Sequence, residues 1–288
     1  QLARPEPRTL ARPTPEPGFP GEQRAIAVTV DSTLPCSVVE SVGDGVATLD
    51  GDKAVTEVIG HGGEFEYTVN LDRRGRHQLG PARCRVTDSL GLFRAAVVTD
   101  DATTVLVYPR VHELKPGALS QFGGNGRGRA QGWSDERAAF DRLRQFTPDD
   151  TMRDIHWRAS AKRPADEFLV SEYTGQGARG AITVVGEAAT DGVDAMASAV
   201  GSIVLHLLEA GVTLTVVVPS GKRLVRPSEA AEALRLLAIT ESGTRSEADQ
   251  VADIHVRGDE GAATVRVAGS ELEFDAIADG SRERAVIG

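Results

Sequence analysis

Residues 180–218 read GAITVVGEAATDGVDAMASAVGSIVLHLLEAGVTLTVVV, and this stretch decides the fold of the C-terminal part of the chain. Its two apolar runs, 180–186 and 212–218, have the length of buried strands. Between them, apolar residues recur at intervals of three and four, which predicts a helix over 192–210 that Gly211 ends as a C-cap residue. Fully apolar strands around a helix are typical of a parallel sheet covered on both faces.

The pattern continues toward the C-terminus. Residues 227–239 predict a second helix, because Pro227 suits a first helical turn and Leu234 and Leu237 fall on one face. A further strand is expected near 253–257, and weaker ones at 263–267 and 271–275. Alternating strands and helices indicate a doubly wound α/β layer structure.

Residues 23–111 instead show short β-runs separated by turn residues. The run RAIAVTVD, residues 24–31, alternates polar and apolar positions as a half-buried strand does. Strands are predicted at 24–31, 33–42, 45–50, 55–59, 64–71, 75–79, 82–88, 93–99 and 103–108. This spacing favours an immunoglobulin-like or fibronectin-like β-sandwich. The fold class predicted for the whole chain is therefore α+β with two domains.

Composition places the boundaries. Residues 1–22 are rich in proline and predict an extended tether, and 23–114 form the predicted sandwich. Residues 115–133 are a glycine-rich linker, and 134–288 complete the α/β domain. The GGNGRG run within the linker lacks the GK[ST] ending of a phosphate-binding P-loop, so we interpret it as a flexible connection.

Charge and cysteine content exclude several classes of protein. The net charge is −10, and residues 181–288 carry nine Lys and Arg against 17 Asp and Glu. That balance argues against a nucleic-acid partner, which needs a coherent basic face. The two cysteines, Cys36 and Cys84, are too few for a disulfide framework, and we expect reduced, partly buried thiols. No run approaches the ~20 apolar residues of a membrane-spanning helix.

The segment FDRLRQFTPDDTMRDIHWRASAKRPADEFLVSEY, residues 140–173, mixes both charge signs around a tryptophan. Arginine and tryptophan dominate binding hot spots, so this segment is the predicted protein-interaction site. Its spacing resembles the signature of the bacterial "domain of unknown function 58" family, with Asp149 where that family usually has glycine. The candidate site residues are Arg144, Asp150, Arg153, Trp157, Arg158, Ser160 and Lys162.

That resemblance implies further properties. Family members carry two N-terminal transmembrane helices, and because this sequence begins at Gln1 we expect it to be a fragment, membrane-anchored through a segment that it lacks. The implied partner is a MoxR-type AAA ATPase, and because this ATPase needs ATP the chain is expected to face the cytoplasm. The acidic C-terminal domain would then meet a basic surface on the ATPase.

The resemblance also implies a C-terminal region similar to von Willebrand factor A domains, which bind a divalent cation through Asp-x-Ser-x-Ser. Here the three ligand positions become Gly186, Ala188 and Thr190, and the nearby Glu187 and Asp191 fall out of register. We therefore expect no metal and no cofactor.

Two other interpretations of the signature remain open. A hydrolase or transferase would use Ser160 as nucleophile, with His156 and Lys162 as activating groups. No G-x-S-x-G elbow surrounds Ser160, however, which weakens the enzymatic interpretation. A structural ion-pair cluster around Trp157 would explain the same residues without chemistry. The favoured prediction is a non-enzymatic interaction or scaffold protein.

Overall fold

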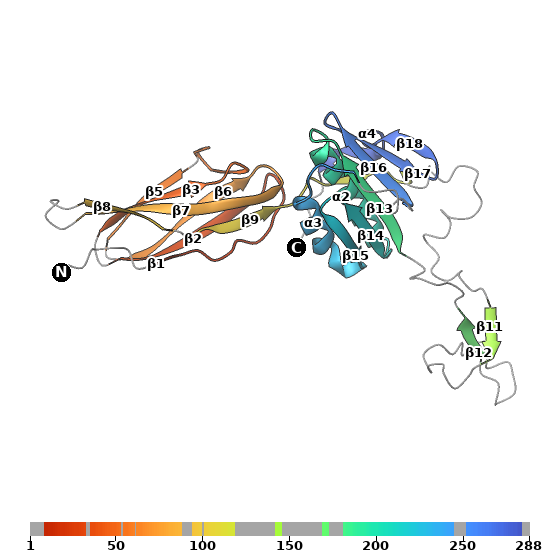
Figure 1. Ribbon diagram of the computed structural model, residues 1–288, viewed down its shortest axis with the longest axis horizontal. Coiled ribbons are helices and arrows are strands. Elements are labelled where there is room, and N and C mark those ends of the chain that lie inside the picture. Colours follow the sequence, from red (N-terminus) through yellow and green to blue (C-terminus); the bar gives the residue numbers. More distant parts are fainter. Residues whose placement is uncertain are drawn as a thin grey trace.

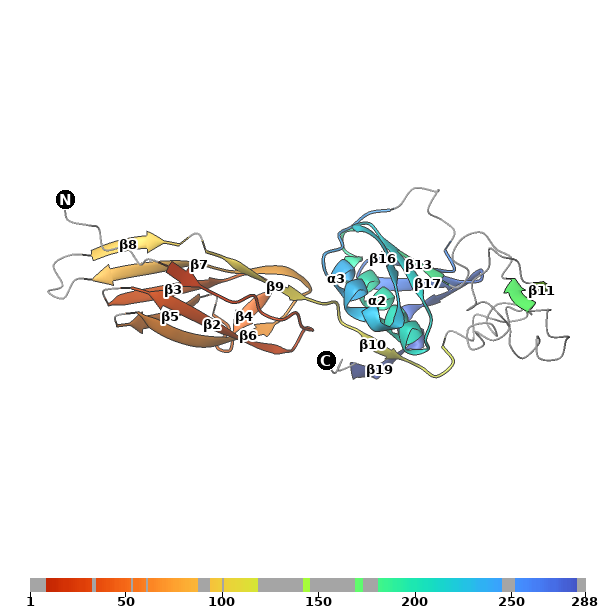
Figure 2. The ribbon, with the colours of Figure 1, turned by 90° about the horizontal axis from the view of Figure 1, so that it is seen from below.

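The described residues form two lobes joined end to end, apart from a separate pair of short strands, Arg142–Gln145 and Leu169–Glu172 (Figure 1). The computed structural model describes residues 9–32, 35–52, 54–60, 62–87, 94–99, 101–118, 142–145, 169–172, 181–244 and 252–283. The first lobe contains only strands, and the second contains a sheet with helices (Figure 2).

Two facing sheets make up the first lobe, and the predicted β-sandwich is confirmed. One sheet has the order β1-β2-β6-β4, with β1 (Thr9–Ala11), β2 (Gln23–Asp31), β6 (Gly63–Leu71) and β4 (Val46–Thr48). The other has the order β5-β3-β7-β8, with β5 (Ala54–Ile59), β3 (Cys36–Val42), β7 (Gly75–Thr87) and β8 (Arg94–Val98), and β9 (Thr103–Val107) also pairs with β7. Alternate residues of each strand, such as Ile26, Val28 and Val30, fill the space between the sheets.

Two details of the sandwich differ from the sequence prediction. The strands predicted at 75–79 and 82–88 are one continuous strand, β7, whose first half pairs with β9 and second half with β3 and β8. The predicted tether is also shorter, because β1 pairs with β2 and Leu10 is buried in the core. Among the described residues of 1–22, the chain therefore belongs to the sandwich from Thr9 onward.

The second lobe is built on a six-stranded sheet of order β15-β14-β13-β16-β17-β18. Its strands are β13 (Ile182–Ala188), β14 (Leu214–Val218), β15 (Gly221–Val225), β16 (Ile254–Asp259), β17 (Ala262–Val267) and β18 (Ser270–Glu273). Helix α2 (Val193–Glu209) packs on this sheet through Met196, Val200 and Ile203, all fully buried. The helical segment η3 (Pro227–Glu229), α3 (Ala230–Ala238) and α4 (Phe274–Ile277) complete the layer.

This sheet is mixed rather than fully parallel. Strand β13 is parallel to β14 and β16, whereas β15, β17 and β18 join their neighbours antiparallel. Tight turns such as Glu260–Gly261 make this possible, because a hairpin needs no crossover helix. In the described part of the chain, the helices that pack on this sheet lie on one face only.

A short connection, residues 108–111, joins the lobes through an apolar cluster of its own. Tyr108 and Val111 pack against Leu205 of α2 and Leu234 of α3. The ring of Phe19 lies 5.2 Å from that of Tyr108, so the sandwich contributes to the same cluster. The apolar contact therefore spans the junction.

Arg74, in the turn between β6 and β7, adds a polar contact across the junction. Its Nη1 donates to the carbonyl oxygens of Leu237 at 2.9 Å and Thr240 at 3.0 Å, at the C-terminal end of α3. Its Nε lies 2.6 Å from Oδ1 of Asp194 in the first turn of α2. A guanidinium that satisfies the last carbonyls of a helix favours a fixed orientation of the two lobes.

The domain boundary therefore lies earlier than the sequence predicted. Strand β10 (His112–Leu114) was assigned to the sandwich, but it pairs with β19 (Ala278–Glu283) near the C-terminus. The backbone N–H of His112 also donates to Oγ of Ser202 in α2, at 2.9 Å. These contacts place residues 112–114 in the second lobe.

Candidate functional site

The signature segment falls largely outside the residues that the structure describes. Arg144 lies in strand β11 (Arg142–Gln145), which pairs antiparallel with β12 (Leu169–Glu172) and faces Val170 in register. This pairing brings the two ends of the signature together at Gln145 and Leu169. Outside the described residues lie Asp150, Arg153, His156, Trp157, Arg158, Ser160 and Lys162.

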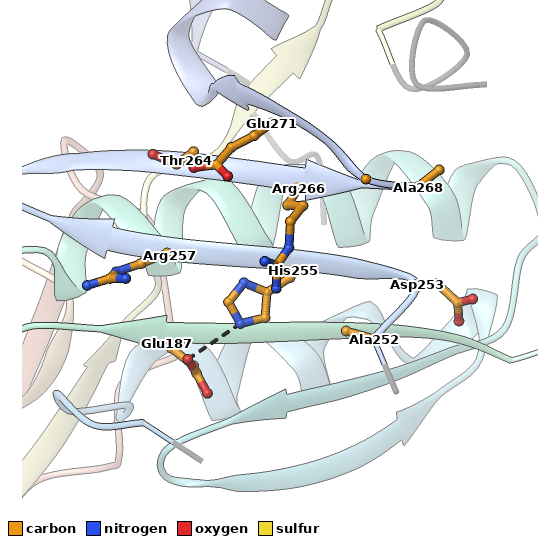
Figure 3. Close-up of a pocket in the computed structure, with 10 residues that line it drawn as sticks. Glu187, Ala252, Asp253, His255, Arg257, Thr264, Arg266, Ala268 and Glu271 are labelled. Atoms are coloured by element: carbon orange, nitrogen blue, oxygen red, sulfur yellow. Dashed lines mark ion pairs between the residues drawn. The ribbon is translucent and has the colours of Figure 1, made fainter. Parts of the chain in front are cut away.

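A charged sheet surface stands out in the described part of the second lobe. It lies on the face of β16, β17 and β18 opposite α2, and we call it the charged face (Figure 3). Cross-strand register places its residues in two rows: His255, Arg266 and Glu271 form one row, and Glu187, Arg257, Thr264 and Glu273 form the other. Because side chains alternate along a strand, buried Val256 and Val265 between them point to the core.

Two shallow hollows run along this face. One encloses about 450 Å³ and the other about 310 Å³, and both are lined by Arg257 and Thr264. Their combined charged lining consists of six carboxylates (Glu187, Asp253, Asp259, Glu260, Glu271 and Glu273) and two arginines (Arg257 and Arg266). Small-molecule sites are mostly apolar with a few polar groups. This lining therefore fits a complementary protein surface better.

The charges of this face are only partly neutralised. Nε2 of His255 lies 3.4 Å from Oε2 of Glu187, and both side chains are mostly buried. Within the described ranges, neither Arg257 nor Arg266 makes an ion pair, although Figure 3 shows the Arg266 side chain reaching toward His255. Exposed charges that are not paired internally remain free to pair with a partner.

Two of the three positions aligned with the von Willebrand metal ligands, Gly186 and Ala188, are closely packed, whereas Thr190 is exposed. A Cβ at Gly186 would lie 2.6 Å from the sulfur of Met196, and the backbone N–H of Ala188 donates to Gly243. Thr190 lies in the turn before α2. No group of three His, Cys, Asp or Glu side chains that could hold a metal ion occurs among the described residues.

A buried polar cluster in the sandwich core was not predicted. Glu40 is fully buried, and its carboxylate accepts two hydrogen bonds from Arg12, of 2.6 and 2.7 Å. The hydroxyl of Tyr67 lies 3.3 Å from the same carboxylate, and burial together with that charge raises the pKa of Tyr67 far above its usual value. Paired and hydrogen-bonded in this way, Glu40 is a structural group.

The two cysteines are free and buried, as the sequence suggested. Burial, with the neighbouring Cys36 thiol and Glu40 carboxylate, raises the pKa of Cys84 to about 11. Burial also raises the pKa of Cys36. Both thiols therefore remain protonated near neutral pH and react slowly as nucleophiles.

The sequence did contain a signal for the charged face. The runs DIHVR (253–257) and ATVRV (263–267) alternate charged and apolar residues with period two, which marks strands with one polar face. What the sequence lacked was the pairing of β13, β16, β17 and β18 that brings their polar positions together. Among the described ranges, no helix is long and apolar enough to cross a membrane.

Comparison with known proteins identifies neither a family nor a curated relative. No family model matches the chain, and no curated protein matches it either. Solved structures similar to part of the chain include a cohesin module of a Clostridium perfringens family 33 glycoside hydrolase, at 8% identity and a TM-score of 0.24. That match covers 34% of this chain and 95% of the module.

Two further solved structures match a similar share of this chain. The PapD-like domain 7 of human CEP192 matches at 11% identity and a TM-score of 0.24, over 37% of this chain and 88% of the domain. The periplasmic chaperone SfaE matches at 13% identity and a TM-score of 0.21, over 34% of this chain and 56% of its own. Scores this low carry no functional argument. The fold itself defines a protein with a β-sandwich lobe and a second lobe in which helices pack on a mixed sheet.

Proposed function

We propose that this chain is a non-enzymatic interaction or scaffold protein that binds another protein through the charged face of its second lobe. In this proposal it is a member of the domain of unknown function 58 family, with an immunoglobulin-like sandwich and a von Willebrand A-like domain. It forms the cytoplasmic, soluble portion of a membrane-anchored protein that acts with a MoxR-type AAA ATPase.

The observation that carries the proposal is the charge distribution of this face. Six carboxylates surround two arginines on an open sheet surface. Strand β18 is exposed along its whole length and presents Glu271 and Glu273 at the rim. A partner with a basic surface and an acidic centre would match this arrangement, and such complementarity sets association rate and specificity.

The junction between the lobes supports the same role. The apolar cluster around Tyr108 and the Arg74 contacts with α2 and α3 favour a fixed orientation. A scaffold that holds a partner at a defined position needs such a joint, because independent domain motion is otherwise the default. The signature segment, closed at its ends by β11 and β12, is the second proposed contact, through Arg144, Asp150, Arg153, Trp157, Arg158, Ser160 and Lys162.

Binding of the purified chain to a purified MoxR-type ATPase from the same source tests this proposal. The double substitution Glu271→Lys and Glu273→Lys should weaken binding to the ATPase by about tenfold or more. It should also make the affinity depend less steeply on salt concentration. The matched control is Glu64→Lys with Glu66→Lys, which makes the same charge change at two exposed positions of strand β6 in the sandwich. This control should bind like the wild type.

A second variant separates the two proposed contacts. Arg153→Ala with Trp157→Ala alters the signature and leaves the charged face intact. If only this variant loses binding, the signature is the docking surface and the charged face is not. If the wild type does not bind the ATPase at any salt concentration, the proposed partnership is wrong.

A further inference from the structure

The outer face of the β5-β3-β7-β8 sheet combines unpaired cations with exposed aliphatic side chains. Arg83 and Arg85 stand two residues apart on β7 and therefore point the same way. In register, Arg83 lies between Val39 of β3 and Val98 of β8, and Arg85 lies between Ser37 of β3 and Ala96 of β8. The same two rows continue to Thr56 and Val58 on β5. We call these eight positions the sandwich patch.

The sandwich patch contains no carboxylate, which sets it apart in a chain of net charge −10. Where the structure describes the chain, neither Arg83 nor Arg85 has a hydrogen-bond or ion-pair partner. Val58 is 76% exposed and Val98 is 53% exposed. Aliphatic side chains this exposed, set around unpaired cations, mark a contact surface.

The opposite outer face of the sandwich has the reverse character. Strands β2 and β6 present Asp31, Glu64 and Glu66 outward, beside Thr29 and Thr68. Of these two faces, as far as their residues are described, the one with Arg83 and Arg85 is the better suited to approach an anionic surface. The overall charge would repel the rest of the molecule from it.

We propose that the sandwich patch rests on an anionic lipid bilayer. This inference depends on the membrane anchorage proposed above and names the surface next to which the sandwich lies. Arginines pair with lipid phosphates, while the valines reach the boundary of the acyl chains. A protein partner is less suited, because the patch offers small aliphatic residues and lacks the aromatic anchors that dominate protein interfaces.

The patch lies toward the end of the sandwich that faces away from the second lobe. The N-terminal strand begins at this end, since Thr9 pairs with Asp31, and Cys36 follows five residues later beside Val86. The other end carries Val107 and leads into the second lobe (Figure 1). Anchorage raises the local concentration to roughly millimolar, so a weak contact suffices.

Flotation with lipid vesicles tests the inference. We expect the chain to float with vesicles of phosphatidylglycerol and phosphatidylcholine at low salt, and not with phosphatidylcholine alone. Replacing Arg83→Glu and Arg85→Glu together should lower the partition coefficient by about tenfold or more, because each basic residue contributes to attraction by the surface. The matched control is Arg257→Glu with Arg266→Glu, which makes the same charge change on the second lobe and should float like the wild type.

Three outcomes would overturn the inference. If the chain floats equally well with both lipid compositions, its binding does not depend on anionic lipid. If the Arg83 and Arg85 variant floats as well as the wild type, the sandwich patch is not the lipid-binding surface. Binding to polyglutamate without flotation would assign the patch to an acidic polypeptide instead. The proposed function is judged separately, because the Arg83 and Arg85 variant should still bind the ATPase if that function holds.

Discussion

Replacing Arg74 with alanine should loosen the junction between the lobes without unfolding either of them. Arg74 lies in the turn between β6 and β7, and, among the described residues, all hydrogen bonds of its guanidinium go to the second lobe. Each lobe has its own core, so the loss is confined to the junction. The side chain of Arg74 is 11% exposed, which means that removal leaves helix carbonyls poorly solvated.

The size of the effect follows from the individual contacts. Nη1 has two hydrogens, which serve the carbonyls of Leu237 and Thr240 at 2.9 and 3.0 Å. Hydrogen bonds from a charged donor contribute about 1.5–3 kcal/mol each, and truncation also forfeits the favourable interaction with the helix dipole. Asp194 adds little, because its carboxylate is 79% exposed and such pairs contribute about 0–1 kcal/mol. We expect a loss of about 3 kcal/mol from Arg74→Ala and under about 1 kcal/mol from Asp194→Ala.

Pulsed electron–electron double resonance between two spin labels would test this prediction, because it measures the distribution of distances between the lobes. Labels at Thr56→Cys and Ser270→Cys, both exposed, report the distance between the lobes, and the buried native thiols should not compete for the label. The wild type should give one narrow distance distribution and Arg74→Ala a broad one. Arg73→Ala is the matched control, since Arg73 is the exposed neighbour in the same turn. A narrow distribution for Arg74→Ala would refute the reasoning and leave the apolar cluster around Tyr108 as the determinant.

Three further predictions concern the interior. Glu40→Ala should destabilise the chain by about 3–5 kcal/mol in urea unfolding, because it leaves the buried charge of Arg12 unpaired; a smaller loss than about 1 kcal/mol would contradict this. Cys84 should react with a thiol reagent only on unfolding. Its pKa is raised to about 11 in the folded chain, so its contribution to stability is complete below the ordinary thiol pKa and is lost as the pH rises toward 11; fast labelling of the native chain at pH 8 would be the contrary result. Gly258→Ala should lower the midpoint of thermal unfolding, because the added Cβ overlaps the backbone of Gly192 at the start of α2 and overpacking costs about 1–3 kcal/mol; the control is Gly60→Ala, where no atom lies within 4 Å of the added Cβ and φ is not positive, and which should leave the midpoint nearly unchanged.

Local elements were largely predictable from the sequence. Alternation in residues 24–31 corresponds to β2, and the three-and-four spacing of Met196, Val200 and Ile203 corresponds to α2. These patterns report which side of an element is buried, and that is a local property. The charged face was predictable in part, since the alternation of 253–257 and 263–267 gave two of its strands.

Other features depended on residues distant in the sequence. Leu10 lies in a proline-rich stretch without periodicity, and its burial follows only from pairing of β1 with β2. The sequence predicted strand β10 as the end of the sandwich, whereas its pairing with β19 places it in the second lobe. Arg74 and Arg12 look like ordinary surface residues in the sequence.

The sequence by itself determined the type and order of the secondary-structure elements in each lobe: a run of short strands first, then strands alternating with helices. It did so because burial of one face imposes a period of two or of about 3.6 on the chain. The tertiary structure alone decided which strands are neighbours and which cations find a carboxylate. Arg12 is paired with buried Glu40, whereas Arg83 and Arg85 lie exposed in the sandwich patch, whose eight positions include no carboxylate. The physical reason is that charge pairing depends on distance in space, and residues far apart in the chain become neighbours only after the sheets have formed.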